Sequence, residues 1–186
     1  DGYKYILNTL KVDSKKVFIT GGSAGGGLVL LTLQKLNKVG LAQPCGGIPI
    51  SPITDVSWST GTKTQNVDGI IDAMVDMRDD FLNTEICIDD EDRKEWDKYE
   101  RASEERKQIL RQGKYSALYG EFKGLCPLYI SASENEVLIN DSKLVVEKCK
   151  ENNVDIEYDW DPYLLHATLA FASGIPEARD KLIIAI

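Results

Sequence analysis

The sequence predicts an α/β protein in which a mostly parallel sheet is flanked by helices. Short apolar runs of strand length alternate along the chain with segments whose apolar residues recur at helical spacing. Strands separated by helices connect through right-handed crossovers, which makes the strands parallel and puts helices on the faces of the sheet. The first run, "VFIT", is continuously apolar rather than alternating, and this is typical of a strand buried on both faces.

The elements follow in the order helix, strand, helix, strand, helical section, strand, helix, strand, helix. The expected strands span 17–20, 46–52, 127–133 and 154–160. The expected helices span 1–11, 24–39, 137–153 and 176–186. Gly40 is predicted to end the second helix in the C′ position, and Pro176 lies in the first turn of the last one. A polar section at about 55–114 has a mostly helical pattern and is predicted to be a helical insertion.

Composition and charge limit the classes of function. The chain is 42% hydrophobic and 28% charged, which is ordinary for a globular protein, and its 186 residues suit one domain. Its net charge of −8 argues against nucleic acid or an anionic membrane as the main partner. No run is apolar and long enough to span a bilayer, and the first residues lack the pattern of a secretory signal. We therefore expect a cytoplasmic protein.

The sequence offers few metal ligands. His166 is the only histidine, and the cysteines form no CxxC pair, so a zinc site of ordinary spacing is not expected. The acidic run 86–106 is typical of a solvated helix face, and it lacks the glycine that a calcium loop needs. The four cysteines are expected to be buried thiols, although disulfides are left open by the sequence. They are Cys45, Cys87, Cys126 and Cys149.

A glycine-rich turn between the first strand and the helix after it is the first candidate site. Residues 21–25 match G-x-S-x-G, the motif that places a serine on a strained strand-to-helix turn. Small residues are expected two positions before and two positions after Ser23, because larger side chains would collide across the turn. The amide of Ala24, at the start of the helix, would donate to the oxyanion of a tetrahedral intermediate. This pattern predicts Ser23 as a nucleophile.

The same turn also fits T-G-x-x-x-G-x-G, the cofactor loop of short-chain dehydrogenases. That class needs a charged residue about 20 positions further on to meet the cofactor ribose. Between Ala24 and Pro52 there is no Asp or Glu, and the only basic residues are lysines inside the predicted helix. Tyr119 and Lys123 match the Tyr-x-x-x-Lys of that class, but two residues match easily by chance. A NAD(P) enzyme is disfavoured and stays an alternative, as does a turn that only packs helix on strand.

A serine nucleophile needs a base, normally a histidine that a carboxylate orients. His166 comes just after the last predicted strand, on a loop at the same edge of the sheet. The acid should follow the third strand, where Glu134, Glu136 and Asp141 are candidates. Loop position favours the first two, since Asp141 would lie inside the helix. A cap or first-turn role is the alternative for each acid.

Four segments resemble the hormone-sensitive-lipase-like carboxylesterase branch of the α/β-hydrolases, also called fold-3. "VFITGGSAGGGLVLLTLQKL" resembles the G-D-S-A-G-G elbow of that branch with its following helix, and "ISPITDVS" resembles its S-P-x-x-D-L segment. "SALYGEFKGLCPLYISASENEVLINDS" is similar to the stretch that leads into its acid loop. "LLHATLAF" stands where the branch has its catalytic histidine. The segments occur in the order of the family and cover nearly the whole chain.

The resemblance implies a Ser-Glu-His triad of Ser23, Glu136 and His166, with the Ala24 amide as an oxyanion donor. The acid falls on Glu136 because the branch has its acid two residues before a leucine, here Leu138. Glu134 is the fallback. The implied activity is that of an esterase or lipase on small or medium acyl esters, without a cofactor. Amidases that share the order Ser, acid, His, and a catalytically silent binding protein on the same fold, stay as alternatives.

The resemblance also implies that residues 1–186 are the C-terminal part of a single α/β-hydrolase domain. The family has further strands and a His-Gly-Gly oxyanion loop upstream of the elbow, and these are not in the chain. Gly22, Ala117 and Cys126 replace an aspartate and two prolines of the family pattern. We expect a partial sheet to expose an apolar edge through which the chain self-associates. Whether residues 1–186 are active alone is left open.

Overall fold

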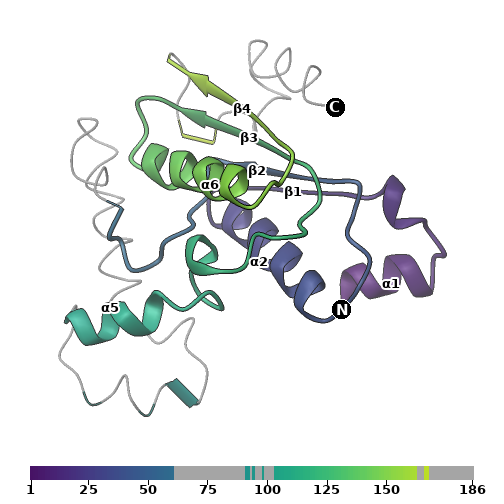
Figure 1. Cartoon of the computed structure of the whole chain (residues 1–186), viewed down its shortest axis with the longest axis horizontal. Helices are drawn as coiled ribbons and strands as arrows, with labels where there is room; N and C mark the ends of the chain where they lie inside the picture. The colour runs from purple at the N-terminus through teal and green to yellow at the C-terminus, as the bar shows by residue number, and fades with distance from the viewer. Residues whose placement is uncertain (61–90, 93, 95–97, 99–102, 163–165, 168–186) are drawn as a thin grey trace.

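The structure is a computed structural model that describes residues 1–60, 91–92, 94, 98, 103–162 and 166–167. Its strands form one parallel sheet in the order β1-β2-β3-β4 (Figure 1). They span Phe18–Gly22, Gly46–Ile50, Leu128–Ser133 and Ile156–Asp161. The α-helices α1, α2, α5 and α6 span Gly2–Asn8, Ala24–Lys38, Glu104–Leu110 and Ile139–Glu151. The predicted α/β class and the order of the described elements are confirmed, although α1 is shorter than expected.

The hydrophobic core lies between the sheet and the helices α2 and α6, which pack against the same face (Figure 1). The segment 117–126, which begins with the short 3₁₀-helix η2 (Ala117–Tyr119), fills the space between the two helices. The buried core side chains are Val29, Leu30, Leu33, Ala117, Leu118, Phe122, Leu125, Cys126, Leu128, Ile130, Val145, Val146, Cys149 and Val154. The helix predicted at 176–186 and most of the predicted helical insertion lie outside the described residues; α5 is the described helix of that insertion.

The parallel strands bring three loops to one edge of the sheet. In the register of the sheet Gly22 lies beside Ile50, Ile50 beside Ser131, and Ser133 beside Asp161. The carboxyl ends of all the strands therefore lie at the same edge, where ligands of open parallel sheets bind. The turn after β1 and the loops after β3 and β4 leave the sheet there.

Helix α2 ends with Gly40 in the C′ position, as the sequence predicts. The N–H of Leu41 donates to the carbonyl of Leu36 over 2.9 Å, and the N–H of Gly40 donates to the carbonyl of Asn37 over 3.1 Å. Gly40 has a φ of 67°. This pair of bonds around a left-handed glycine is a Schellman motif, which satisfies the last carbonyls of the helix.

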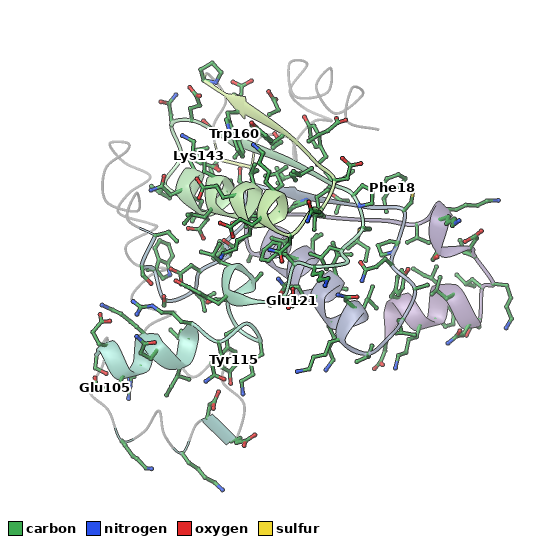
Figure 2. The ribbon with its side chains drawn as sticks, viewed as in Figure 1. Phe18, Glu105, Tyr115, Glu121, Lys143 and Trp160 are labelled. Carbon is green, nitrogen blue, oxygen red and sulfur yellow. The ribbon has the colours of Figure 1, made fainter. Side chains whose placement is uncertain are left out.

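The exposed part of the described fold lies around β1 and α1. No residue of α1 is buried, so the described residues cover its apolar stripe only in part. Strand β1 pairs with β2 alone among the described strands, and Phe18 on β1 is 51% exposed (Figure 2). The expected exposure of an apolar sheet edge therefore holds for the part of the chain that the structure describes.

Three cysteines are free thiols in the described residues. Cys126 and Cys149 are buried, as predicted, whereas Cys45 is only partly buried. Cys87 lies outside the described residues. Within the described ranges, no helix combines the length and the apolar character that crossing a bilayer requires.

Candidate active site

Ser23 lies on the turn between β1 and α2 in a conformation that few residues adopt. Its φ is 56° and its ψ is −120°. A positive φ outside glycine is uncommon, and such strain clusters at functional sites. The N–H of Ser23 donates to the carbonyl of Ile50 over 2.9 Å, and its own carbonyl accepts from the N–H groups of Gly27 and Ile53 over 3.2 and 3.1 Å. Backbone bonds on both sides therefore hold the strained residue in place.

The side chain of Ser23 is not used to cap the helix. Ser23 occupies the N-cap position of α2, where a serine hydroxyl ordinarily accepts from an N–H group of the first turn. No such bond is made, so the hydroxyl is available for chemistry. The next residue, Ala24, is exposed, and its N–H is among the first of the helix, which lack partners inside a helix and attract negative charge. A hydroxyl that makes no cap bond and a polarised N–H donor thus follow each other in the chain.

The glycines around the serine are not equally required. A Cβ on Gly21 would lie 2.5 Å from the carbonyl oxygen of Gly25, which confirms that position 21 must be small. A Cβ on Gly25 would meet no described atom within 4 Å. The expectation that both positions must be small was therefore wrong for Gly25 among its described neighbours. The turn brings the backbone of residue 25, rather than its side-chain direction, against residue 21.

A carboxylate and an imidazole meet at the same edge of the sheet. Glu136 follows β3 and His166 follows β4, and the Nδ1 atom of His166 lies 2.9 Å from Oε2 of Glu136. The glutamate side chain is 1% exposed and the histidine side chain 22% exposed. A carboxylate on Nδ1 favours the tautomer with its proton there, and this leaves Nε2 as an acceptor. The pair has the arrangement of a general base with its orienting acid.

Glu134, the alternative acid, faces another way. It is exposed, and its N–H donates to the carbonyl of Asp161 over 2.9 Å, which extends the pairing of β3 with β4 by one bond. Glu136, two residues on, is buried. Among the described residues, the Glu136 carboxylate is the one of these two that contacts His166.

Asp141, the third candidate, lies in the first turn of α6, which was the alternative for each acid, and has a different partner. It is fully buried, and its carboxylate accepts from the N–H groups of Thr54 and Asp55 over 2.9 and 3.0 Å. Asp55, also fully buried, accepts from the N–H groups of Ser57 and Ser59. A buried carboxylate needs such donors to replace lost water. The Asp141 carboxylate thus fastens the loop after β2 to α6, and the Asp55 carboxylate holds the turn within that loop.

The residues that matched a dehydrogenase lie far from the serine turn. Tyr119 and Lys123 belong to the segment beside the end of α2, where the side-chain amide of Asn37 donates to the carbonyl of Lys123 over 2.7 Å. Ser23 lies at the other end of this 15-residue helix, and a helix of that length spans about 22 Å. The two halves of the dehydrogenase pattern are therefore not brought together by the described fold.

A cavity of about 800 Å³ lies beside the second half of α2. Its lining includes Gln34, Lys35, Lys114 and Glu121, the last of which Figure 2 labels, and it includes neither Ser23 nor His166. In the described residues, no group of three His, Cys, Asp or Glu side chains gathers as a metal ion would require.

A serine on a strained strand-to-helix turn, with a buried glutamate bonded to a partly buried histidine at the same edge of a parallel sheet, is the arrangement of one class, the α/β-hydrolases. A family model described as alpha/beta hydrolase fold matches residues 1–170, and the chain belongs to this family. Hormone-sensitive-lipase-like esterases are among the structures that it resembles, as the sequence motifs predicted.

Two curated proteins show how far the similarity extends. An acetyl-hydrolase of Streptomyces hygroscopicus is 24% identical over 171 residues, which are 91% of this chain and 50% of that protein. Esterase LipU of Mycobacterium tuberculosis is 27% identical over 187 residues, which are 98% of this chain and 56% of that protein. The chain thus spans about half the length of the curated relatives it matches.

Solved structures give the same picture. An esterase/lipase from an uncultured bacterium has a TM-score of 0.73 and 27% identity, with 97% of this chain and 54% of that chain covered. A hormone-sensitive lipase from a metagenome library, 21% identical, shares the fold with a TM-score of 0.65 over 95% of this chain and 54% of its own.

Proposed function

We propose that this chain carries the nucleophile, acid and base of a serine carboxylic-ester hydrolase for small or medium acyl esters. The family, and relatives named esterase and acetyl-hydrolase, support the reaction class. The observation that carries the proposal is the bond between Glu136 and His166 at the edge of the sheet from which the strained Ser23 turn also leaves.

In this proposal, Oγ of Ser23 attacks the ester carbonyl carbon while Nε2 of His166 takes the hydroxyl proton. The Glu136 carboxylate stabilises the imidazolium, and the Ala24 N–H donates to the developing oxyanion. Collapse of the tetrahedral intermediate breaks the bond to the alcohol oxygen, which leaves with the proton from His166. Water, deprotonated by the same histidine, then attacks the acyl-serine and releases the acid and the free serine. No cofactor takes part.

The Ala24 N–H alone would form only part of an oxyanion hole. Each missing donor costs roughly 10²–10³ in rate. We propose that residues 1–186 form one part of a single hydrolase domain, whose other strands and remaining oxyanion donors come from further chain. The coverage of about half of each relative supports this division.

A fluorophosphonate probe, which reacts with activated serines, tests the assignment. We expect residues 1–186, and more rapidly any longer form of the protein, to be labelled. Ser23→Ala should abolish labelling, whereas Ser14→Ala, a change at a partly exposed serine before β1, should leave it intact. Labelling that persists in Ser23→Ala would contradict the assignment. Hydrolysis of p-nitrophenyl esters of increasing acyl length, beside a matched anilide, then separates an esterase from an amidase.

We also propose that the protein is cytoplasmic and that residues 1–186, without further strands, self-associate through the edge of β1. Free thiols at Cys45, Cys126 and Cys149 are what a reducing compartment favours. An edge strand with an exposed Phe18 is open to pairing with another chain. Sedimentation of the wild type and of Phe18→Lys at several concentrations measures this association.

A further inference from the structure

We propose that Ser51 is a positioning residue that holds the base His166 within reach of Ser23; this inference rests on the proposed function. Ser51 directly follows β2 and is 1% exposed. Its Oγ accepts a hydrogen bond of 2.9 Å from the N–H of Ala167, the residue after His166. The contact joins positions 116 residues apart in the chain. The sequence places Ser51 in an S-P-x-x-D segment and gives it no role.

The segment 50–53 connects the loops of the site. The carbonyl of Ile50 accepts from the N–H of Ser23, and the N–H of Ile53 donates to the carbonyl of Ser23. Between these bonds, the N–H of Ser51 donates to the carbonyl of Ser131 on β3 over 2.8 Å, and β3 leads to the acid loop. The backbone of this segment therefore holds the nucleophile and the strand of the acid. The Ser51 hydroxyl also holds the loop that carries the proposed base, His166.

Both residues joined by this hydroxyl have unusual backbone conformations. The φ of Ser51 is 43° and the φ of Ala167 is 53°, in the left-handed region that non-glycine residues rarely adopt. Such conformations persist where surrounding contacts over-determine them. Ala167 is itself buried, so its N–H needs a partner inside the protein. The Ser51 hydroxyl supplies that partner and selects the loop conformation in which Nδ1 of His166 meets Glu136.

Loss of the hydroxyl should therefore act on the base rather than on the nucleophile. Ser51→Ala keeps the Cβ atom and leaves the buried Ala167 N–H without its partner, a costly state that a shift of the loop would relieve. A displacement of about 1 Å in an active site costs roughly 100-fold in rate. Ser51→Gly removes the same hydroxyl and accepts the positive φ without strain, so it preserves the fold.

Ser142 supplies a matched control. It is fully buried in α6, and its hydroxyl has no hydrogen-bond partner in the described structure. Ser142→Ala thus removes a buried hydroxyl without removing a hydrogen bond.

The test combines the single imidazole of the chain with the rate of serine labelling. With one histidine in the sequence, ¹⁵N-labelled histidine gives one pair of ring nitrogen signals. In the wild type and in Ser142→Ala we expect the signature of the Nδ1-protonated tautomer. Both Ser51 variants should show a mixture of tautomers and fluorophosphonate labelling slowed roughly 10- to 100-fold.

Ring signals like those of the wild type in both Ser51 variants would overturn the proposal, even if the variants were less stable, because Ser51 would then be merely structural. An equal change in Ser142→Ala would overturn it as well. If the wild type is not labelled at all, the proposed function fails, and the ring signals alone decide whether Ser51 positions His166.

Discussion

At the scale of single residues, the backbone decides what a side chain can do. Serine at the start of a helix usually caps it, and the hydroxyl is then occupied. The φ of 56° at Ser23 turns this residue out of the capping arrangement, and the strained backbone is held by bonds from Ile50, Gly27 and Ile53. The turn therefore leaves the hydroxyl of Ser23 without the cap bond that a serine at this position usually makes, as the proposed role of nucleophile requires.

The two glutamates after β3 allow a matched comparison. Glu136→Gln keeps the size of the side chain but removes the charge that orients and stabilises His166, so we expect labelling and ester turnover to fall roughly 10³–10⁴-fold. Glu134→Gln, at an exposed side chain two residues away, should change either rate by less than about twofold. Both rates can be measured on the same preparations. Equal losses in the two variants would contradict the choice of Glu136.

At the scale of elements, α2 lies so close to the loop after β2 that a glycine is needed at the contact. A Cβ on Gly27 would collide with the carbonyl oxygen of Ile53, whereas a Cβ on Gly25 would meet no described atom within 4 Å. Helix and loop can approach in this way only where a side chain is missing. The same carbonyl belongs to the residue whose N–H holds Ser23.

Gly27→Ala and Gly25→Ala test this contact. Both changes favour the helix by up to about 1 kcal/mol. In Gly27→Ala the collision should outweigh this gain and lower the free energy of unfolding by about 1–3 kcal/mol. Gly25→Ala should unfold at an equal or higher urea concentration than the wild type. The same effect in both variants would show that the contact with Ile53 does not control the packing.

The helices and strands could be predicted from the sequence because the spacing of apolar residues follows which side of each element is buried. The described strands begin and end within two residues of the predicted ones. Burial of individual helix positions was less predictable: Leu28 lies in the apolar run of α2 but is 61% exposed. A helix buries one face against the core, and Leu28 lies on another face than Val29, Leu30 and Leu33.

The candidate site was predictable where chemistry demands a residue type. Ser23 could be proposed from the G-x-S-x-G motif, and the acid and base could be sought as a carboxylate and a histidine on loops that parallel strands bring to one edge. Ser51, Asp55 and Asp141 were not predictable as partners, because their roles come from contacts made across the fold. The sequence alone does not show whether a polar residue after a strand is exposed to water or makes a buried hydrogen bond.

At the scale of the whole molecule, the core contains thiols that resist ionisation. Burial raises the pKa of the Cys126 thiol to about 11 and that of the Cys149 thiol to about 12. In the unfolded chain a cysteine thiol has a pKa of about 8.5. Above that pH the unfolded chain loses protons that the native protein retains. The stability that the neutral thiols contribute is therefore complete below about pH 8.5 and falls as the pH rises toward their native pKa values.

Urea unfolding at pH 7.5, 9 and 10 measures this dependence. We expect the free energy of unfolding to fall across the series, and to fall less steeply in the double variant Cys126→Ala, Cys149→Ala. Val146→Ala, which also truncates a buried side chain of α6, should lower stability but keep the wild-type slope. A slope in the double variant equal to that of the wild type would show that these thiols do not cause the alkaline loss.

The order of the strands also matters while the protein is being made. Ser23, directly after β1, is added to the chain before Ile50 and Ile53, whose backbone holds its turn, and well before His166, which follows β4. A domain folds as a unit, so the serine turn and the Glu136–His166 pair form only after the loop that follows β4 has been synthesised. In the proposed function, the serine of a shorter nascent chain therefore lacks its base.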